Sequence, residues 1–191
     1  MAKVAAVKKE AKPKFERFRI VEGTVSGFVG DAFSEITELG EEFREIVDNA
    51  PDGLRESDLN NRRDETASAC EGLNEPSADN DILGELSASY QADYGKVYRG
   101  RISQSRACRA SNAAAAFNAA ADAVRQWVED YPLLDDEATK KDKKEHADML
   151  KANEWDADAF CEAHEAADAL ISECEDCASE IENMEWPGMF G

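Results

Sequence analysis

Apolar residues along the chain recur three and four positions apart over long stretches, and turn-forming residues separate these stretches. This spacing places apolar side chains on one face of an α-helix. It occurs in residues 28–48, 57–73, 81–97, 101–131, 135–152 and 155–185. Proline and glycine, which end helices, lie in the intervening segments. The pattern predicts an all-α protein, an irregular bundle of five or six helices. The number is five or six because residues 135–152 are polar enough to form either a helix or a linker.

The first and last of these stretches have the clearest division between apolar and acidic faces. The apolar positions of the first predict an inward stripe of Val29, Phe33, Ile36, Leu39, Phe43, Ile46 and Val47. Its glutamates are predicted on the opposite face: Glu35, Glu38, Glu42 and Glu45. The last stretch predicts an inward stripe of Phe160, Ala163, Ala167, Leu170, Ile171, Cys174, Ala178 and Ile181. Its predicted outer face carries Asp158, Glu162, Glu165, Glu173, Asp176 and Glu180.

Residues 15–25 do not follow the helical pattern. They mix β-branched and aromatic residues with charge, which is typical of a short strand or a packed extended segment. The sequence offers no convincing second strand, so a sheet here would be minimal or completed by a partner. We predict a helix over 81–97 although Gly84 and Gly95 weaken the pattern.

The two ends of the chain differ from its middle. Residues 1–14 are rich in lysine and alanine, with Pro13 interrupting any helix, and predict a basic extended arm. Residues 15–185 are expected to form one helical domain, followed by an apolar tail at 186–191. In that tail Trp186 and Phe190 are aromatic anchors that either dock on a partner or fold back on the bundle.

Charge narrows the choice of partners. Asp and Glu number 42 against 22 Lys and Arg, for a net charge of −20. Residues 1–19 hold seven basic and two acidic residues, a net of +5, so the remainder carries −25. Such a surface repels nucleic acid and anionic membranes and attracts basic protein surfaces. No apolar run is long enough to span a bilayer, and the N-terminus lacks the apolar core of a signal peptide, so we expect a cytoplasmic protein.

The sequence contains little that resembles a catalytic or metal site. The only metal-like spacing is Cys161-x-x-His164 followed by Cys174-x-x-Cys177. Both pairs fall on one predicted helix, where thirteen residues separate Cys161 from Cys174 by roughly 20 Å, so the four side chains cannot converge on zinc. The five cysteines are interpreted as reduced thiols. With two histidines, no nucleophile elbow and no phosphate-binding glycine loop, we predict no catalytic residues, no cofactor and no enzymatic activity.

Part of the chain resembles a known group of proteins. Residues 34–51 read SEITELGEEFREIVDNAP, and a second predicted helix ends in Ala69-Cys70-Glu71-Gly72-Leu73. This resembles small acidic helical proteins of phages and mobile elements, in which a Glu-rich helix ends in E-E-M-R-E-W-x-D-N-x-P. Phe43 and Ile46 replace the Met and Trp of that pattern. The resemblance covers about 40 residues and implies a phage-like origin, without assigning any site residue.

Two function classes remain from these observations. The first is a non-enzymatic protein that binds a partner with a basic surface, including an inhibitor that mimics the charge of nucleic acid. The second is a structural or assembly component of a virion, anchored to copies of itself or to other virion proteins by its basic arm and apolar tail. Candidate partner-binding residues are Glu35, Glu38, Glu42, Glu45, Asp158, Glu162, Glu165, Asp176, Glu180, Trp186 and Phe190.

Overall fold

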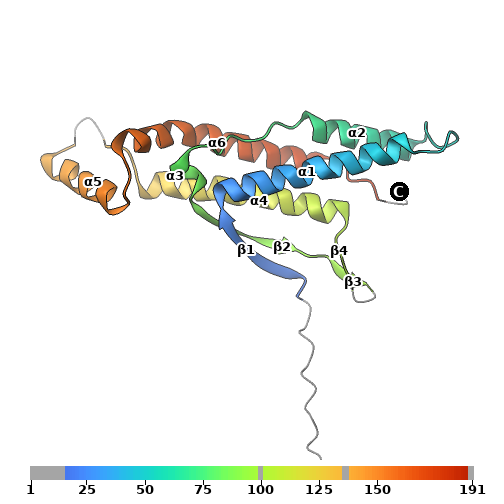
Figure 1. Ribbon diagram of the computed structural model, residues 1–191, viewed down its shortest axis with the longest axis horizontal. Helices are drawn as coiled ribbons and strands as arrows, with labels where there is room; N and C mark the ends of the chain where they lie inside the picture. The colour runs from blue at the N-terminus through green and yellow to red at the C-terminus, as the bar shows by residue number, and fades with distance from the viewer. Residues whose placement is uncertain (1–15, 99–100, 135–137, 189–191) are drawn as a thin grey trace, which may run out of the picture.

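The computed structural model describes residues 16–98, 101–134 and 138–188, and these residues are mostly helical (Figure 1). The predicted basic arm (1–14) and Phe190 lie outside the described residues. The helices are α1 (Val25–Asp48), α2 (Asp58–Gly72), α3 (Asp81–Gly84), α4 (Arg106–Asp130), α5 (Lys140–Ala152) and α6 (Ala157–Asn183). The strands are β1 (Phe18–Thr24), β2 (Ser87–Asp93), β3 (Lys96–Tyr98) and β4 (Arg101–Ser103). The prediction of a helical bundle with a short strand near the N-terminus is confirmed.

The long helix α4 lies at the centre of the bundle. It packs against α6 on one side and α1 on the other, and α2 covers α1 (Figure 1). Phe117 of α4 is 1% exposed and belongs to the same apolar core as Ile36 of α1 and Leu170 of α6. Six alanines of α4 are buried as well: Ala110, Ala113, Ala114, Ala116, Ala120 and Ala121. Small side chains on two faces of one helix leave room for a neighbouring helix on each side.

Side-chain caps fix where the helices begin. Thr24 Oγ1 accepts a hydrogen bond from the Gly27 amide at 3.2 Å, so α1 starts three residues earlier than the apolar pattern predicts. Ser57 caps α2, as predicted, and Asp156 accepts hydrogen bonds from two amides at the start of α6. Each cap satisfies amides that have no partner within the helix. The polar segment after residue 135 is a helix, α5, which begins at Lys140 behind a Thr139 capping box and contains no fully buried residue.

The helix predicted over 81–97 is wrong. Only Asp81–Gly84 is helical, and Ser87–Asp93 forms β2, which pairs antiparallel with β1 from Phe18 opposite Asp93 to Thr24 opposite Ser87. The physical reason is the alternation in S-A-S-Y-Q-A-D, which turns Ala88, Tyr90 and Ala92 toward the helices. The next predicted helix likewise starts at Arg106 rather than Arg101, because residues 101–103 pair with β3 as β4.

Candidate functional site

Three of the glutamates on α1 form ion pairs with arginines of α4. Arg106 Nε donates to Glu42 Oε2 at 2.8 Å, and Arg109 forms ion pairs with both Glu35 and Glu42. Arg109 Nη2 also lies 3.5 Å from Glu38 Oε2. The prediction that these glutamates lie opposite the packed face is therefore wrong for Glu35 and Glu42. Because α4 and α2 pack on two sides of α1, the covered face is wider than one apolar stripe, and its margin is acidic.

The arginines of α4 favour the ionised form of Glu42. Burial opposes ionisation of Glu42, but hydrogen bonds from Arg109 and Arg106 outweigh burial and lower the pKa of Glu42 below its ordinary value. On the other side of α1, Arg44 pairs with Asp64 and with Glu71 of α2. Of the four predicted partner-binding glutamates of α1, Glu45 alone forms no ion pair with a residue that the structure describes. Glu35 and Glu42 therefore hold α1 and α4 together, whereas Glu38 and Glu45 remain exposed.

The outer face of α6 is different. This helix of 27 residues carries nine Asp and Glu and no Lys or Arg. Arg125 of α4 forms an ion pair with Glu175, and Glu173 accepts a hydrogen bond from the Ser77 amide at 3.0 Å. The predicted partner-binding residues of α6 are all exposed, and none forms an ion pair within the described part of the chain: Asp158, Glu162, Glu165, Asp176 and Glu180. The structure thus leaves one long, unneutralised acidic face.

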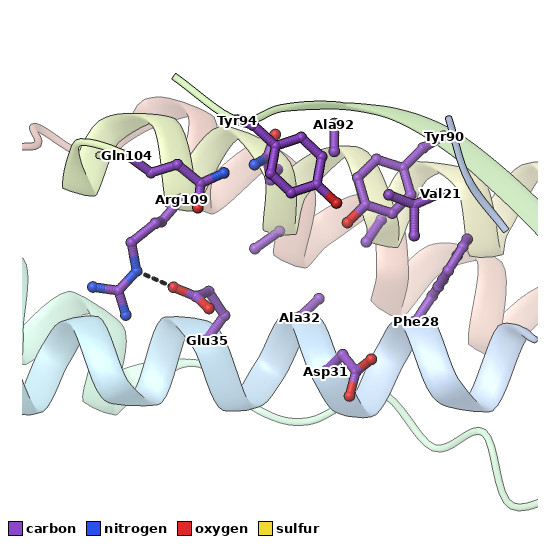
Figure 2. A pocket seen from close by; sticks show the side chains of 13 residues that line it. Val21, Phe28, Asp31, Ala32, Glu35, Tyr90, Ala92, Tyr94, Gln104 and Arg109 are labelled. Atoms are coloured by element: carbon purple, nitrogen blue, oxygen red, sulfur yellow. Dashed lines mark hydrogen bonds and ion pairs between the residues drawn. The ribbon is translucent and has the colours of Figure 1, made fainter. Parts of the chain in front are cut away.

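A pocket of ≈ 220 Å³ lies between α1, α4 and the β1–β2 ribbon (Figure 2). Phe28 meets Tyr90 edge-to-face at 5.1 Å, and the hydroxyls of Tyr90 and Tyr94 point into the space above Ala32. The Glu35–Arg109 pair closes one end. Burial raises the pKa of Tyr90, and the neighbouring acidic groups add to the effect. The pocket therefore combines aromatic rings with the carboxylates of Asp31 and Glu35.

Hydrogen bonds from Asn112 of α4, and from Gln104 just before α4, hold the ribbon over this pocket. The side-chain oxygen of Asn112 accepts a hydrogen bond from the Asp93 amide at 2.9 Å, and its side-chain nitrogen donates to the Asp93 carbonyl at 2.9 Å. Gln104 donates to the same carbonyl at 2.7 Å. The lining residues include no Ser, Cys or His, and the groups able to exchange a proton there are the carboxylates of Asp31 and Glu35 and the tyrosine hydroxyls. The pocket does not follow from the predicted helix over 81–97, in which Tyr90 and Ala92 would not lie side by side on a strand facing α1. The polar–apolar alternation of residues 87–93 is the signal that identifies the strand.

The cysteine and histidine pairs of α6 lie on one continuous helix, as the geometric argument requires. Cys161 is exposed, whereas burial raises the pKa of Cys174 to about 12 and that of Cys177 to about 11. His164 Nε2 lies 2.7 Å from the Tyr131 carbonyl oxygen, and its ring packs on Trp127. Within the described ranges, no group of three or more His, Cys, Asp or Glu side chains is placed to hold a metal ion.

The start of the apolar tail packs on the bundle. Trp186 Nε1 donates to the Ile181 carbonyl at 3.1 Å, and the ring lies 6.3 Å from that of Phe43. Thr66 Oγ1 donates to the Glu185 carbonyl at 2.8 Å. Trp186 therefore contributes to the fold, which leaves less of its surface for a partner.

Comparison with protein-family models, with curated proteins and with solved structures gave no match. Among the described residues, no helix is both long and apolar enough to cross a bilayer.

Proposed function

We propose that this protein is a non-enzymatic binding protein that uses the outer face of α6 to dock on a basic surface of another protein. The sharper form of the proposal is an inhibitor that occupies a groove where its partner otherwise binds nucleic acid. The resemblance of residues 34–73 to small acidic phage proteins agrees with such a role. The partner is a protein rather than a nucleic acid, because a face of this sign repels phosphates.

The contrast between α1 and α6 is the observation that supports this proposal. Both helices are acidic, but arginines of α4 neutralise much of the margin of α1, whereas Asp158, Glu162 and Glu165 on α6 form no ion pair with any residue of the described part of the chain. Clustered carboxylates repel one another and gain no stability from that arrangement. A partner with a basic groove would relieve the repulsion, and its binding would release counterions from both surfaces.

The unneutralised carboxylates of α6 are spaced more widely than the phosphates of a nucleic-acid strand. Asp158 and Glu180 lie 22 residues apart, about 33 Å along the helix, so the five carboxylates of the face give one charge per roughly 8 Å of axis. One strand of duplex DNA carries a phosphate every ~3.4 Å. The face therefore matches only part of the charge of one strand, which suits a groove that binds a single backbone better than one that wraps a duplex.

A pair of charge-reversal variants tests the proposal. The first changes Glu162, Glu165 and Asp176 to Lys, on the face of α6. The matched control changes Glu41, Asp48 and Glu129 to Lys, which are equally exposed but lie on α1 and α4. Both variants shift the net charge by the same amount, and surface changes of this kind usually alter the free energy of unfolding by only about 0.5 kcal/mol each.

Each protein is immobilised and exposed to a lysate of the cells that express it. We expect the wild type and the control to retain a basic protein that added duplex DNA displaces and that moderate salt elutes, and the α6 variant to lose it. Equal retention by both variants, or retention indifferent to salt and DNA, would contradict the proposal.

A second candidate, an assembly component, is supported by one observation. The outer residues of β1 include Phe18 and Ile20, which are 50% and 63% exposed, on a strand that has an open edge. An assembly protein would lose incorporation on deletion of residues 1–14 and tolerate reversal of the α6 charges. Deletion of residues 186–191 is a poorer test, because Trp186 packs against Phe43.

A further inference from the structure

The strand β1 has one paired and one unpaired edge. It pairs with β2 alone among the described strands, and β2 is the strand that runs along α4, which leaves β1 on the outside of the ribbon (Figure 1). Natural edge strands are commonly protected by proline, a bulge, an inward charge or a covering loop. β1 contains no proline, and its register with β2 is continuous over all seven residues. Its one charge on the side of the helices is Arg19, which lies over the Tyr94 ring at 5.0 Å.

The hydrogen bonds at both ends of the ribbon show which groups of β1 face outward. The Val25 amide donates to the Leu86 carbonyl at 2.9 Å, and the Tyr94 amide donates to the Arg17 carbonyl at 2.8 Å. Alternate residues of an antiparallel strand make the bonds to one neighbour, so the odd-numbered residues of β1 bond to β2. The N–H and C=O groups of Phe18, Ile20 and Glu22 therefore point to the open edge.

The same residues carry the exposed apolar side chains. Phe18 and Ile20 lie on the outer face of the ribbon, where Phe18 has only the Arg17 guanidinium over its ring, 4.9 Å away. Two large apolar side chains thus accompany three backbone donor and acceptor pairs that bond to no other strand among the described residues. An edge of this kind is a template for adding a strand.

Charge at this edge does not oppose a second copy of the chain. β1 holds one basic residue, Arg19, and one acidic residue, Glu22, so its net charge is zero in a chain of −20. A basic partner gains nothing here, whereas a second acidic copy is not repelled at this strand. Two identical edges are also complementary to each other when they pair antiparallel about a two-fold axis.

We infer that the open edge of β1 is a binding surface for β1 of a second copy of this chain, which joins two ribbons into one four-stranded antiparallel sheet. The pairing places Ile20 opposite Ile20 of the second copy and Phe18 opposite Glu22 of the second copy. If the register is shifted toward the start of β1, the Arg19 side chains of the two copies lie opposite each other, which is unfavourable. If the register is shifted toward the end of β1, Ile20 lies opposite Glu22 of the second copy, and the two Ile20 side chains are separated.

The first test measures mass against concentration by light scattering on the full chain. We expect the mass to rise toward twice 21.0 kDa as concentration increases. Ile20→Lys places two like charges at the two-fold axis and should raise the dissociation constant at least about tenfold. The matched control is Leu54→Lys, which makes the same kind of change at a side chain 57% exposed, outside the strand, and should leave the mass profile unchanged. A wild-type chain that stays monomeric at every concentration, or two variants that behave alike, would overturn the inference.

The second test fixes the register by disulfide trapping. Residues directly opposite in a hydrogen-bonded antiparallel pair have Cα atoms about 5.5 Å apart, within the range that a disulfide bridges. In a Cys161→Ser background, which removes the exposed thiol, Ile20→Cys should cross-link into a dimer on mild oxidation. Glu22→Cys should not, because the two copies of that residue lie several residues apart along the sheet. Cross-linking at Glu22→Cys and not at Ile20→Cys would refute the pairing. The edge of β1 and the acidic face of α6 lie on opposite sides of α4, so either result leaves the α6 proposal to its own test (Figure 1).

Discussion

Gly40 in α1 lies directly against Cys70 in α2. A Cβ atom placed on Gly40 would be 2.8 Å from the Cys70 Cβ and 3.7 Å from the Ala67 carbonyl oxygen. Glycine inside a helix costs about 1 kcal/mol relative to alanine. The close approach of α2 is the physical reason for glycine at this position, and the Arg44 ion pairs to Asp64 and Glu71 lie beside the same contact.

This contact predicts opposite effects for two similar substitutions. Gly30→Ala, also in α1, meets nothing within 4 Å and should stabilise the protein by about 0.5–1 kcal/mol through helix propensity. Gly40→Ala should destabilise it by about 1–3 kcal/mol, because the added methyl forces the helices apart. Urea unfolding measures both. Cys70→Gly should cost less stability in the Gly40→Ala background than in the wild type, because it removes the atom that the new methyl meets. Equal costs in the two backgrounds would show that the steric explanation is wrong.

The arginine at the centre of the α1–α4 contact gives a second prediction. Arg109→Met keeps a long side chain but leaves Glu35, Glu38 and Glu42 without their shared cation. We expect a loss of about 1–3 kcal/mol in the free energy of unfolding, because the remaining carboxylates are partly buried and repel one another. The control is Arg55→Met, whose pair with Asp52 is largely exposed and should contribute little. Equal losses of unfolding free energy for the two variants would show that the ion pairs of Arg109 contribute no more than an exposed ion pair.

The lowered pKa of Glu42 predicts a pH dependence. A carboxylate whose pKa is lower in the folded than in the unfolded state stabilises the fold above its unfolded pKa of about 4.3 and stops doing so as pH falls through the folded value. Glu42→Gln should therefore be less stable than wild type at pH 7, and the difference should shrink as the pH falls below about 4. Thermal melts across that range measure it. A difference that stays constant with pH would rule out Glu42 as a contributor to the acid transition.

The sequence predicted the long helices well because each has a strong signal of its own. Buried positions of α1 recur at helical spacing: Val29, Ile36, Leu39 and Phe43. Ser57 indicates the start of α2, because its side chain caps that helix. The strand β2 was missed because Ile82, Leu86 and Tyr90 also fit a helical period. The alternation of residues 87–93 indicates a strand, and the pairing with β1, which sets Val21 opposite Tyr90 sixty-nine residues away, stabilises it over the helix.

The candidate surfaces could be predicted only in part. The exposure of Asp158, Glu162 and Glu165 follows from the period of α6. The neutralisation of Glu35 and Glu42 does not, because it depends on which helix packs beside α1 and on where Arg106 and Arg109 fall along it. Periodicity gives the face of a single helix, whereas ion pairing between helices is a property of their arrangement.

The absence of lysine from α6 has a practical consequence for any binding measurement. Lysines occur at positions 3–14, at 96 and at 140–151, so reagents that react with amines cannot modify α1, α2, α4 or α6. A chain tethered to a sensor through its amines is therefore held by its N-terminal segment, by Lys96 or by α5. In each of these orientations the carboxylates of α6 stay chemically untouched.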